Sequence, residues 1–191
     1  WDKFDGKPHS GFYTQQEMKE LVKYAADRNI TIIPEIDLPG HMVAVLATYP
    51  KLGCTGGPYK VRETWGVAED VLCAGNDETY DFIKNILEEV TEIFPSEYIH
   101  IGGDECPKTN WKKCPKCQAK IKNLGIKGDS KHTSEEYLQS YVITFAEEVL
   151  AKKGRKMIGW DEILEGGLAP NATVMSWRGI GGAIEAAKSN H

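Results

Sequence analysis

Two adjacent carboxylates, Asp104 and Glu105, are the side chains in this sequence best placed to do chemistry. They follow the apolar stretch 98–101, which predicts a β-strand, and Gly102 and Gly103 separate that strand from the two acids. Glycines allow the backbone to turn sharply and allow a ligand to approach closely. Two acids at the end of a strand can serve one small substrate as proton donor and as stabiliser of a developing charge. A solvated surface turn could have the same composition, so the motif needs support from the rest of the chain.

Polar and aromatic side chains also accompany three other apolar runs, at residues 30–36, 156–160 and 173–177, each of which predicts a strand. These side chains are Glu35, Asp37 and His41; Trp160, Asp161 and Glu162; and Trp177 and Arg178. Because the C-terminal ends of parallel strands lie at one edge of a sheet, and barrels build their active sites there, we expect them near Asp104 and Glu105.

Amphipathic helices separate the predicted strands. The spacing of apolar residues predicts helices over 15–29 and 76–94, from Thr133 to Gly154, and over 180–188. Capping-box patterns begin two of them, at Thr14 and Thr133. Alternation of helices with nearly all-apolar strands predicts an α/β fold with a parallel sheet covered by helices.

The positions of the polar groups favour a (β/α)8 TIM barrel over a doubly wound sheet, and no glycine-rich phosphate-binding motif opens a helix. A complete barrel has eight strands and about 250 residues. Only four strands are predicted here, because long loop excursions at 42–76 and 106–132 use much of the chain. We therefore predict that residues 1–191 are a fragment of a single barrel domain, a partial TIM barrel.

Composition limits the possible partners. The chain has 191 residues, 41% hydrophobic and 27% charged, with a net charge of -5 and a pI near 5.6. This acidic balance argues against nucleic acid or an anionic membrane as a partner. No apolar run approaches the roughly 20 residues that span a bilayer. The sequence opens on Trp1 without a visible signal peptide, so we expect a processed chain or an excerpt.

Four motifs, in this order, resemble those of glycoside hydrolase family 20, the β-N-acetylhexosaminidases. They are PEIDLPGH at 34–41, HIGGDE at 100–105, GWDE at 159–162 and SWRG at 176–179. The resemblance runs from Tyr13 onward and implies about strands three to six of the family's catalytic barrel. It also implies that groups gripping the sugar hydroxyls and closing the acetamido pocket belong to strands missing from this chain. The excursion at 106–132 is longer than the family leads us to expect.

The resemblance implies a substrate-assisted mechanism without a carboxylate nucleophile. Glu105 would protonate the glycosidic oxygen, and the substrate's own acetamido carbonyl would attack the anomeric carbon. Asp104 would accept a hydrogen bond from the acetamido N–H and stabilise the developing positive charge. Glu105 would then activate water, so that configuration is retained.

Five further residues receive supporting roles from the resemblance: His41, Asp37, Trp160, Asp161 and Trp177. His41 would orient the acid, and Asp37 would either bond His41 or cap the next turn. The two tryptophans would wall the pocket, although tryptophans in strands commonly pack in a core. Asp161 would fix the loop at Trp160 or meet the substrate, whereas Glu162 is expected to be structural.

The expected partner is an N-acetylhexosamine-containing glycan, with no metal or cofactor, in the periplasm or outside the cell as the family implies. Two alternatives stay open. A metal-dependent barrel enzyme would use Glu35, Asp37, Asp104 and Glu105 as ligands. A non-catalytic sugar-binding fragment would keep only the pocket walls.

Five cysteines complete the candidate residues. In an exported glycosidase, Cys54 and Cys73 are expected to form a disulfide, since they flank part of the first excursion. Cys106, Cys114 and Cys117 could bind zinc with His132 or another fourth ligand, form a disulfide or stay free.

Overall fold

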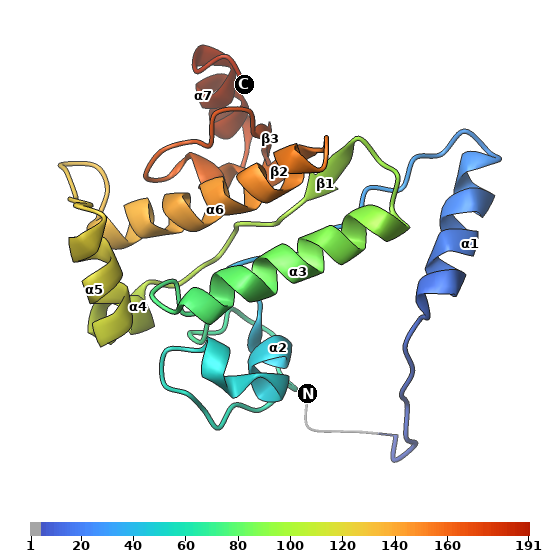
Figure 1. Cartoon of the computed structure of the whole chain (residues 1–191), viewed down its shortest axis with the longest axis horizontal. Helices are drawn as coiled ribbons and strands as arrows, with labels where there is room; N and C mark the ends of the chain where they lie inside the picture. The colour runs from blue at the N-terminus through green and yellow to red at the C-terminus, as the bar shows by residue number, and fades with distance from the viewer. Residues whose placement is uncertain (1–4) are drawn as a thin grey trace.

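The computed structural model describes residues 5–191 and has a mixed α/β architecture (Figure 1). Trp1 lies outside the described residues. The strands are β1 (Tyr98–His100), β2 (Lys156–Trp160) and β3 (Thr173–Met175). The helices are α1 (Gln15–Ala26), α2 (Val43–Thr48), α3 (Asp77–Ile93), α4 (Thr109–Lys113), α5 (Pro115–Asn123), α6 (Ser134–Lys152) and α7 (Ile180–Lys188), with short 3₁₀ turns at Pro50–Leu52 and Asp161–Leu164. Among these helices, none has the length and apolar character needed to cross a membrane.

The three strands form a parallel sheet in the order β1-β2-β3. Ile99 lies opposite Met157, and Gly159 lies opposite Val174. Neighbouring strands therefore follow one another along the chain, as in the wall of a (β/α) barrel and unlike the switch point of a doubly wound sheet. The α/β class and the parallel sheet are as the sequence predicts.

The first predicted strand, 30–36, is wrong in its extent. Glu35 alone forms a parallel bridge, to His100, and the backbone bonds to β1 run from Pro34 to Leu38. Ile30 and Ile33 are 58% and 42% exposed instead of buried. A run of β-branched residues becomes a strand only where a neighbouring strand accepts its hydrogen bonds, and β1 offers partners from Pro34 onward only.

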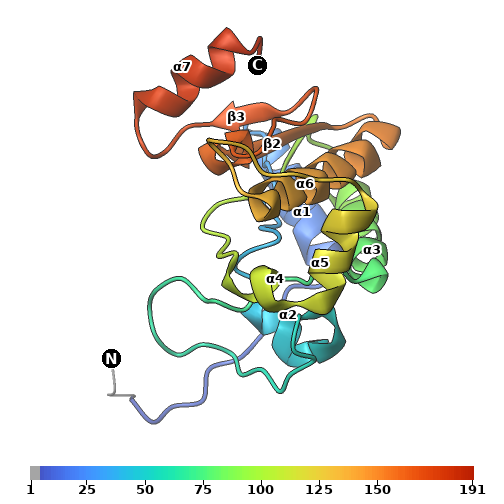
Figure 2. The same cartoon turned by 90° about the vertical axis from the view of Figure 1, so that its left-hand side faces the viewer.

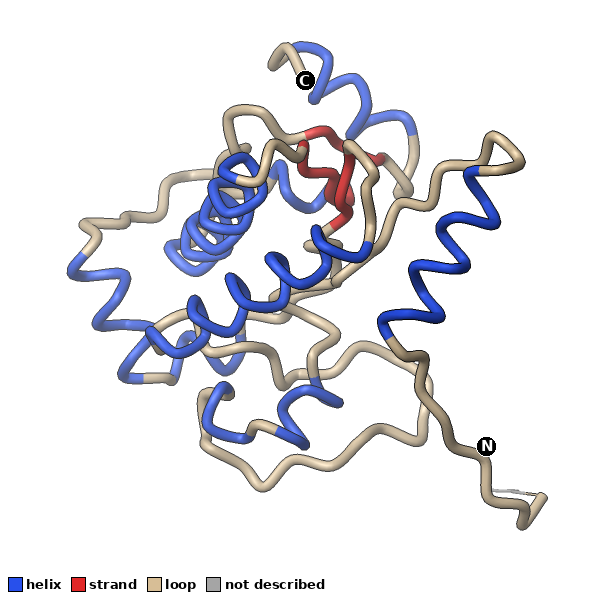
Figure 3. Tube along the Cα trace, turned by 45° about the vertical axis from the view of Figure 1, so that its right-hand side comes forward, coloured by secondary structure: helices blue, strands red, loops and turns tan. Residues whose placement is uncertain are grey.

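Helices α3 and α6 pack against each other and lie in front of the strands in Figure 1, while α1 lies beside α3 at the edge of the fold (Figures 1 and 3). The apolar faces of α3 and α6 pack against the strands in one continuous core. Fully buried members include Ile83, Leu87, Ile99, Leu138, Val142 and Met157. The capping boxes predicted at Thr14 and Thr133 are both present, with Glu17 and Glu136 as the reciprocal partners.

The two excursions lie outside the sheet, but they are not wholly loop as predicted. The first contains α2, whose Val43 and Leu46 are buried, and the second contains α4 and α5. They pack on each other below the sheet (Figure 2), where the Trp111 indole donates a 2.9 Å hydrogen bond to the Leu72 carbonyl. Burial of these side chains stabilises helices that are too short to be stable alone.

Candidate active site

Asp104 and Glu105 follow β1 through a turn that requires glycine. Gly102 and Gly103 have φ values of 67° and 95°, in the region that L side chains rarely adopt. A Cβ on Gly102 would overlap Asp37, and the Gly103 amide donates a 3.2 Å hydrogen bond to Asp37 Oδ1. The glycines therefore bring the first motif into contact with the two acids.

His41 lies among three carboxylates. Its Nε2 is 3.5 Å from Asp104 Oδ2, 3.5 Å from Glu105 Oε2 and 3.9 Å from Asp37 Oδ2. Gly40 packs closely against the Asp104 carbonyl, which holds the His41 turn against the acid turn. The fold thus brings four of the predicted site residues together from two motifs that lie far apart in the sequence.

Asp37 and Asp104 form an asymmetric pair of acids. Burial, followed by the negative charge of Asp104, raises the pKa of Asp37 to about 8. Asp37 is therefore protonated near neutral pH, and its hydroxyl can donate to Asp104. Asp104 Oδ1 is buried and has no hydrogen-bond partner among the described residues. The protonated Asp37 therefore adds no negative charge beside Asp104 and Glu105.

A cavity of about 440 Å³ lies beside Glu105. Its lining includes Glu105, Lys108, Gln139, Glu162, Trp177 and Arg178. Trp177 is 51% exposed, and its indole donates a 3.0 Å hydrogen bond to Glu162 Oε2. Of the predicted pocket walls, Trp177 therefore borders the space next to the candidate acid.

Three polar residues of this cavity, Lys108, Gln139 and Glu162, were not predicted from the sequence as site residues. Burial raises the pKa of Glu162, which was expected to be structural. Gln139 donates a 2.7 Å hydrogen bond to the Gly103 carbonyl and contacts Lys108 through its side-chain oxygen. Only Glu162 carried a signal, because it adjoins Asp161 in the third motif. Lys108 and Gln139 lie in an excursion and in the middle of α6, where no motif marks them.

Asp161 holds the segment that follows β3. Its Oδ1 accepts the Trp177 amide at 3.0 Å, and its Oδ2 accepts Arg178 Nε at 2.7 Å. Burial acts to raise the pKa of Asp161, but these hydrogen bonds from Trp177 and Arg178 outweigh it and lower the pKa. Asp161 is buried and does not line the cavity. Its carboxylate thus fixes the turn at Trp177. The sequence had predicted that Asp161 would either fix the loop at Trp160 or meet the substrate.

Trp160 lies away from the 440 Å³ cavity. Its indole donates a 2.9 Å hydrogen bond to Glu35 Oε1, and its ring packs against His100 with centroids 4.6 Å apart. His100 accepts the Gly102 amide at Nδ1, and burial lowers the pKa of this imidazole. Trp160 and Trp177 therefore do not face each other across this cavity, and the role of Trp160 as a pocket wall stays a prediction.

Within residues 5–191, two groups of side chains could hold a metal ion by geometry. Asp37, His41 and Asp104 each offer a ligand atom, and these atoms lie within 4.8 Å of one another. The second group consists of four cysteines: Cys54, Cys73, Cys114 and Cys117. Neither Cys106 nor His132 belongs to it, contrary to the ligand set considered from sequence. All five thiols are free, so the predicted disulfide between Cys54 and Cys73 is wrong for this structure.

Acids that follow parallel strands beside a cavity bordered by tryptophan are the arrangement in which (β/α) barrel enzymes build their active sites. The model of the family described as glycosyl hydrolase family 20, catalytic domain, matches residues 1–191. The chain belongs to this family.

Its relatives are longer proteins of the same kind. It is 54% identical over 187 residues to the beta-hexosaminidase of Porphyromonas gingivalis, covering 98% of this chain and 23% of that protein. It is also similar to the crystal structure of beta-N-acetylhexosaminidase from Bacteroides fragilis, with a TM-score of 0.81, 41% identity, and coverage of 95% of this chain and 35% of that one.

A third similar structure is the exo beta-N-acetylglucosaminidase of Vibrio harveyi in complex with N-acetylglucosamine. The TM-score is 0.78 and the identity 33%, covering 94% of this chain and 28% of that one. These family 20 structures are TIM-barrel enzymes. The chain therefore spans about a quarter to a third of the length of the relatives that it matches.

Proposed function

We propose that the protein hydrolyses terminal N-acetylhexosamine residues of β-linked glycans with retention of configuration. The observation that carries this proposal is the turn that places Asp104 and Glu105 side by side, with His41 Nε2 at 3.5 Å from both carboxylates. Adjacent acids suit one edge of a substrate, whereas a nucleophile and an acid must flank the scissile bond from two sides. The substrate then has to supply the nucleophile itself.

In the proposed reaction, Glu105 gives its proton to the glycosidic oxygen as the bond to the anomeric carbon breaks. The acetamido carbonyl oxygen forms a new bond to that carbon, which yields a cyclic oxazolinium ion and releases the aglycone. Glu105 then takes a proton from water, which attacks the anomeric carbon and reopens the ring. Because the nucleophile is tethered to the reacting carbon, proximity lowers the barrier by several kcal/mol.

Asp104 supports the charged intermediate in this scheme. Burial raises the pKa of Asp37 to about 8, so this neighbour of Asp104 is protonated near neutral pH and adds no second negative charge beside it. An ionised carboxylate held in a partly buried site stabilises a developing cation better than one in water. The acetamido N–H and the positive ring of the intermediate are the groups that it would meet.

The matched relatives support the substrate class, because one of them was solved with N-acetylglucosamine bound. We propose that this chain supplies about strands three to six of the barrel, so that the remaining sugar contacts come from other parts of the protein. We also propose a periplasmic or secreted location, which cell fractionation tests.

The test is hydrolysis of an aryl N-acetylglucosaminide by the full-length protein, followed by NMR to establish the anomer that is released first. Release of the β-anomer from a β-glycoside supports the proposal, and release of the α-anomer overturns it. The ligand atoms of Asp37, His41 and Asp104 make a metal-dependent reaction the second candidate. Activity that is unchanged after chelation and dialysis supports the substrate-assisted reaction, and activity that is lost and then restored by Mg²⁺ or Mn²⁺, which carboxylates favour and thiolates do not, supports the second candidate.

A further inference from the structure

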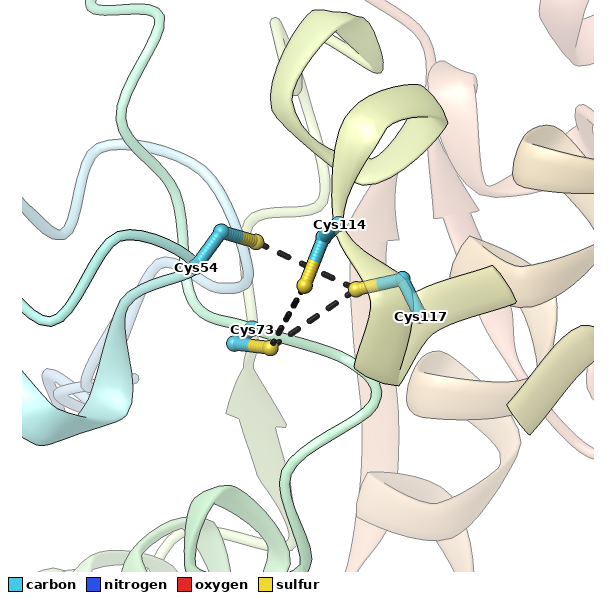
Figure 4. A group of neighbouring side chains, drawn as sticks. All are labelled: Cys54, Cys73, Cys114 and Cys117. Carbon is cyan, nitrogen blue, oxygen red and sulfur yellow. Dashed lines mark hydrogen bonds between the residues drawn. The ribbon is translucent and has the colours of Figure 1, made fainter. Parts of the chain in front are cut away.

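Four cysteines from the two excursions meet in one cluster below the sheet (Figure 4). We propose that Cys54, Cys73, Cys114 and Cys117 bind one zinc ion as a tetrahedral tetrathiolate site. All four Sγ atoms lie within 4.8 Å of one another. Cys73, Cys114 and Cys117 are buried, and Cys54 is partly buried.

The separations between the sulfur atoms fit this geometry. Cys73 Sγ lies 3.7 Å from Cys114 Sγ and 3.7 Å from Cys117 Sγ, and Cys117 Sγ lies 3.9 Å from Cys54 Sγ. Zinc–sulfur bonds of about 2.3 Å in a regular tetrahedron place neighbouring sulfurs about 3.8 Å apart. The three separations therefore match the edges of a zinc–thiolate tetrahedron.

The same contacts do not select disulfide pairs. Cys73 is equally distant from Cys114 and Cys117, and Cys117 also lies next to Cys54. A disulfide joins two sulfurs at about 2.05 Å and leaves other thiols at van der Waals distance. Four sulfurs that each face a common centre are instead the arrangement of structural zinc sites with four cysteine ligands.

Local backbone features hold the two pairs of ligands in place. Cys114 is the N-cap of α5 and Pro115 occupies its first turn, so Cys114 and Cys117 lie on one short turn. An antiparallel bridge joins Gly53 to Leu72, and the Cys73 amide donates a 2.7 Å hydrogen bond to the Leu52 carbonyl, so the two segments that carry Cys54 and Cys73 lie against each other.

Glycine at position 75 lets these two pairs approach each other. A Cβ on Gly75 would overlap the backbone of Lys116 and Cys117. The backbone of the first excursion thus lies directly against the Cys-x-x-Cys turn of the second. One ion that is bound by ligands from both segments requires the two backbones to lie this close together.

The surrounding charge favours a metal thiolate. Four thiolates around Zn²⁺ leave a net charge of about −2. Residues 108–122 contain six lysines and neither aspartate nor glutamate, in a chain whose overall net charge is -5. This basic segment, which carries two of the ligands, provides compensating positive charge.

The site would join the two excursions that border the catalytic cavity. Val67 of the first excursion and Lys108 of the second both line that cavity. A metal ion that ties residues 54 and 73 to residues 114 and 117 would fix these walls relative to Glu105. The proposed role is structural, because no ligand atom of the cluster lines the cavity.

The experiment begins with full-length protein purified from zinc-supplemented cells and passed over a chelating resin. Elemental mass spectrometry should find about one tightly held zinc ion per chain, the stoichiometry of a single structural site. Alkylation under denaturing conditions without reductant, followed by peptide mapping, should find all four cysteines modified. Absence of zinc, or disulfide-linked peptides containing these cysteines, would overturn the proposal.

Cobalt and two matched variants locate the ion. Co²⁺ added to protein stripped of metal should give the intense visible bands and thiolate charge-transfer absorption of a tetrahedral tetrathiolate. C117S should lose this spectrum and C106S should keep it, since Cys106 is also buried but lies outside the cluster. If C117S does not fold, the wild-type cobalt spectrum and the C106S comparison decide the outcome: a spectrum without thiolate bands, or one abolished by C106S, contradicts the proposed ligands.

Discussion

His41 and Glu105 meet across the site from two turns that both have left-handed backbone conformations. Their φ values are 53° and 44°, and Nε2 of His41 lies 3.5 Å from Oε2 of Glu105. A non-glycine residue in this region costs about 1 kcal/mol or more, and the surrounding structure must compensate for it. Such strain at both residues indicates that the position of Glu105 relative to His41 is fixed by the fold.

The first prediction concerns Glu105 as the general acid. E105Q in the full-length protein should reduce kcat by about 10²–10⁴-fold on substrates with poor leaving groups. Activated aryl leaving groups should be affected less, because they depart without full protonation. Steady-state kinetics on an alkyl and a nitrophenyl N-acetylglucosaminide measure this difference.

E92Q is the matched control for this variant, because Glu92 is an exposed residue of α3. It should leave both rates unchanged. Equal losses on the two substrates in E105Q would remove Glu105 from the role of acid.

The second prediction concerns the charge on Asp104. D104N should lower kcat more than it raises KM, because a charge that stabilises a cation acts mainly in the transition state. It should also weaken the binding of a thiazoline that resembles the cyclised intermediate. Titration calorimetry measures this affinity, and a thiazoline that binds D104N as tightly as the wild type would show that the assignment is wrong.

The third prediction follows from the pKa of Asp37, which is about 8 in the folded protein against 3.8 as its ordinary value. The folded state thus binds the proton more tightly than the unfolded state. The stabilising contribution of this proton is complete below about pH 4 and is lost as the pH rises through about 8. Over this window the free energy of unfolding should fall by up to about 1.4 kcal/mol per pH unit.

Chemical denaturation at several pH values isolates this effect by comparing the wild type with D37N, whose amide does not titrate. The difference between the two should change in the predicted direction between pH 4 and 8. D81N provides the control, since Asp81 is exposed on α3 and should leave the pH profile as it is. Parallel profiles of wild type and D37N would mean that Asp37 is ionised throughout this range.

Periodicity and caps were sufficient to predict four of the seven helices and, within one or two residues, the three strands of the described residues. Helix α7 and strand β2 have the bounds that the sequence indicates, and α6 begins at the predicted capping box. The extent of the strand predicted at 30–36 was wrong because a β-branched run indicates burial but does not show where the neighbouring strand lies. The partner, β1, meets the chain only from Pro34 onward.

The adjacency of Asp104 and Glu105 after β1 was predictable because both acids lie in one short motif. Lys108 and Gln139 were not, since their approach to the site depends on how an excursion and α6 pack in three dimensions. The cysteine cluster was missed for the same reason. Cys54 and Cys73 precede Cys114 and Cys117 by some forty or more residues, and only the packing of the two excursions brings them together.

The last prediction is that the 191 residues expressed alone have little or no hydrolase activity. Relatives matched by this chain are about three to four times longer. Ile30, Ile33 and Trp177 are 58%, 42% and 51% exposed beside the sheet and the cavity. A site without its remaining sugar contacts binds substrate poorly, and misplacement of a reacting group by 1 Å can lower the rate roughly 10²-fold.

The exposed sheet edges should also cause self-association, which size-exclusion chromatography detects. A monomeric chain that cleaves an aryl N-acetylglucosaminide at about 1–10³ s⁻¹ would instead show that these residues hold a complete site.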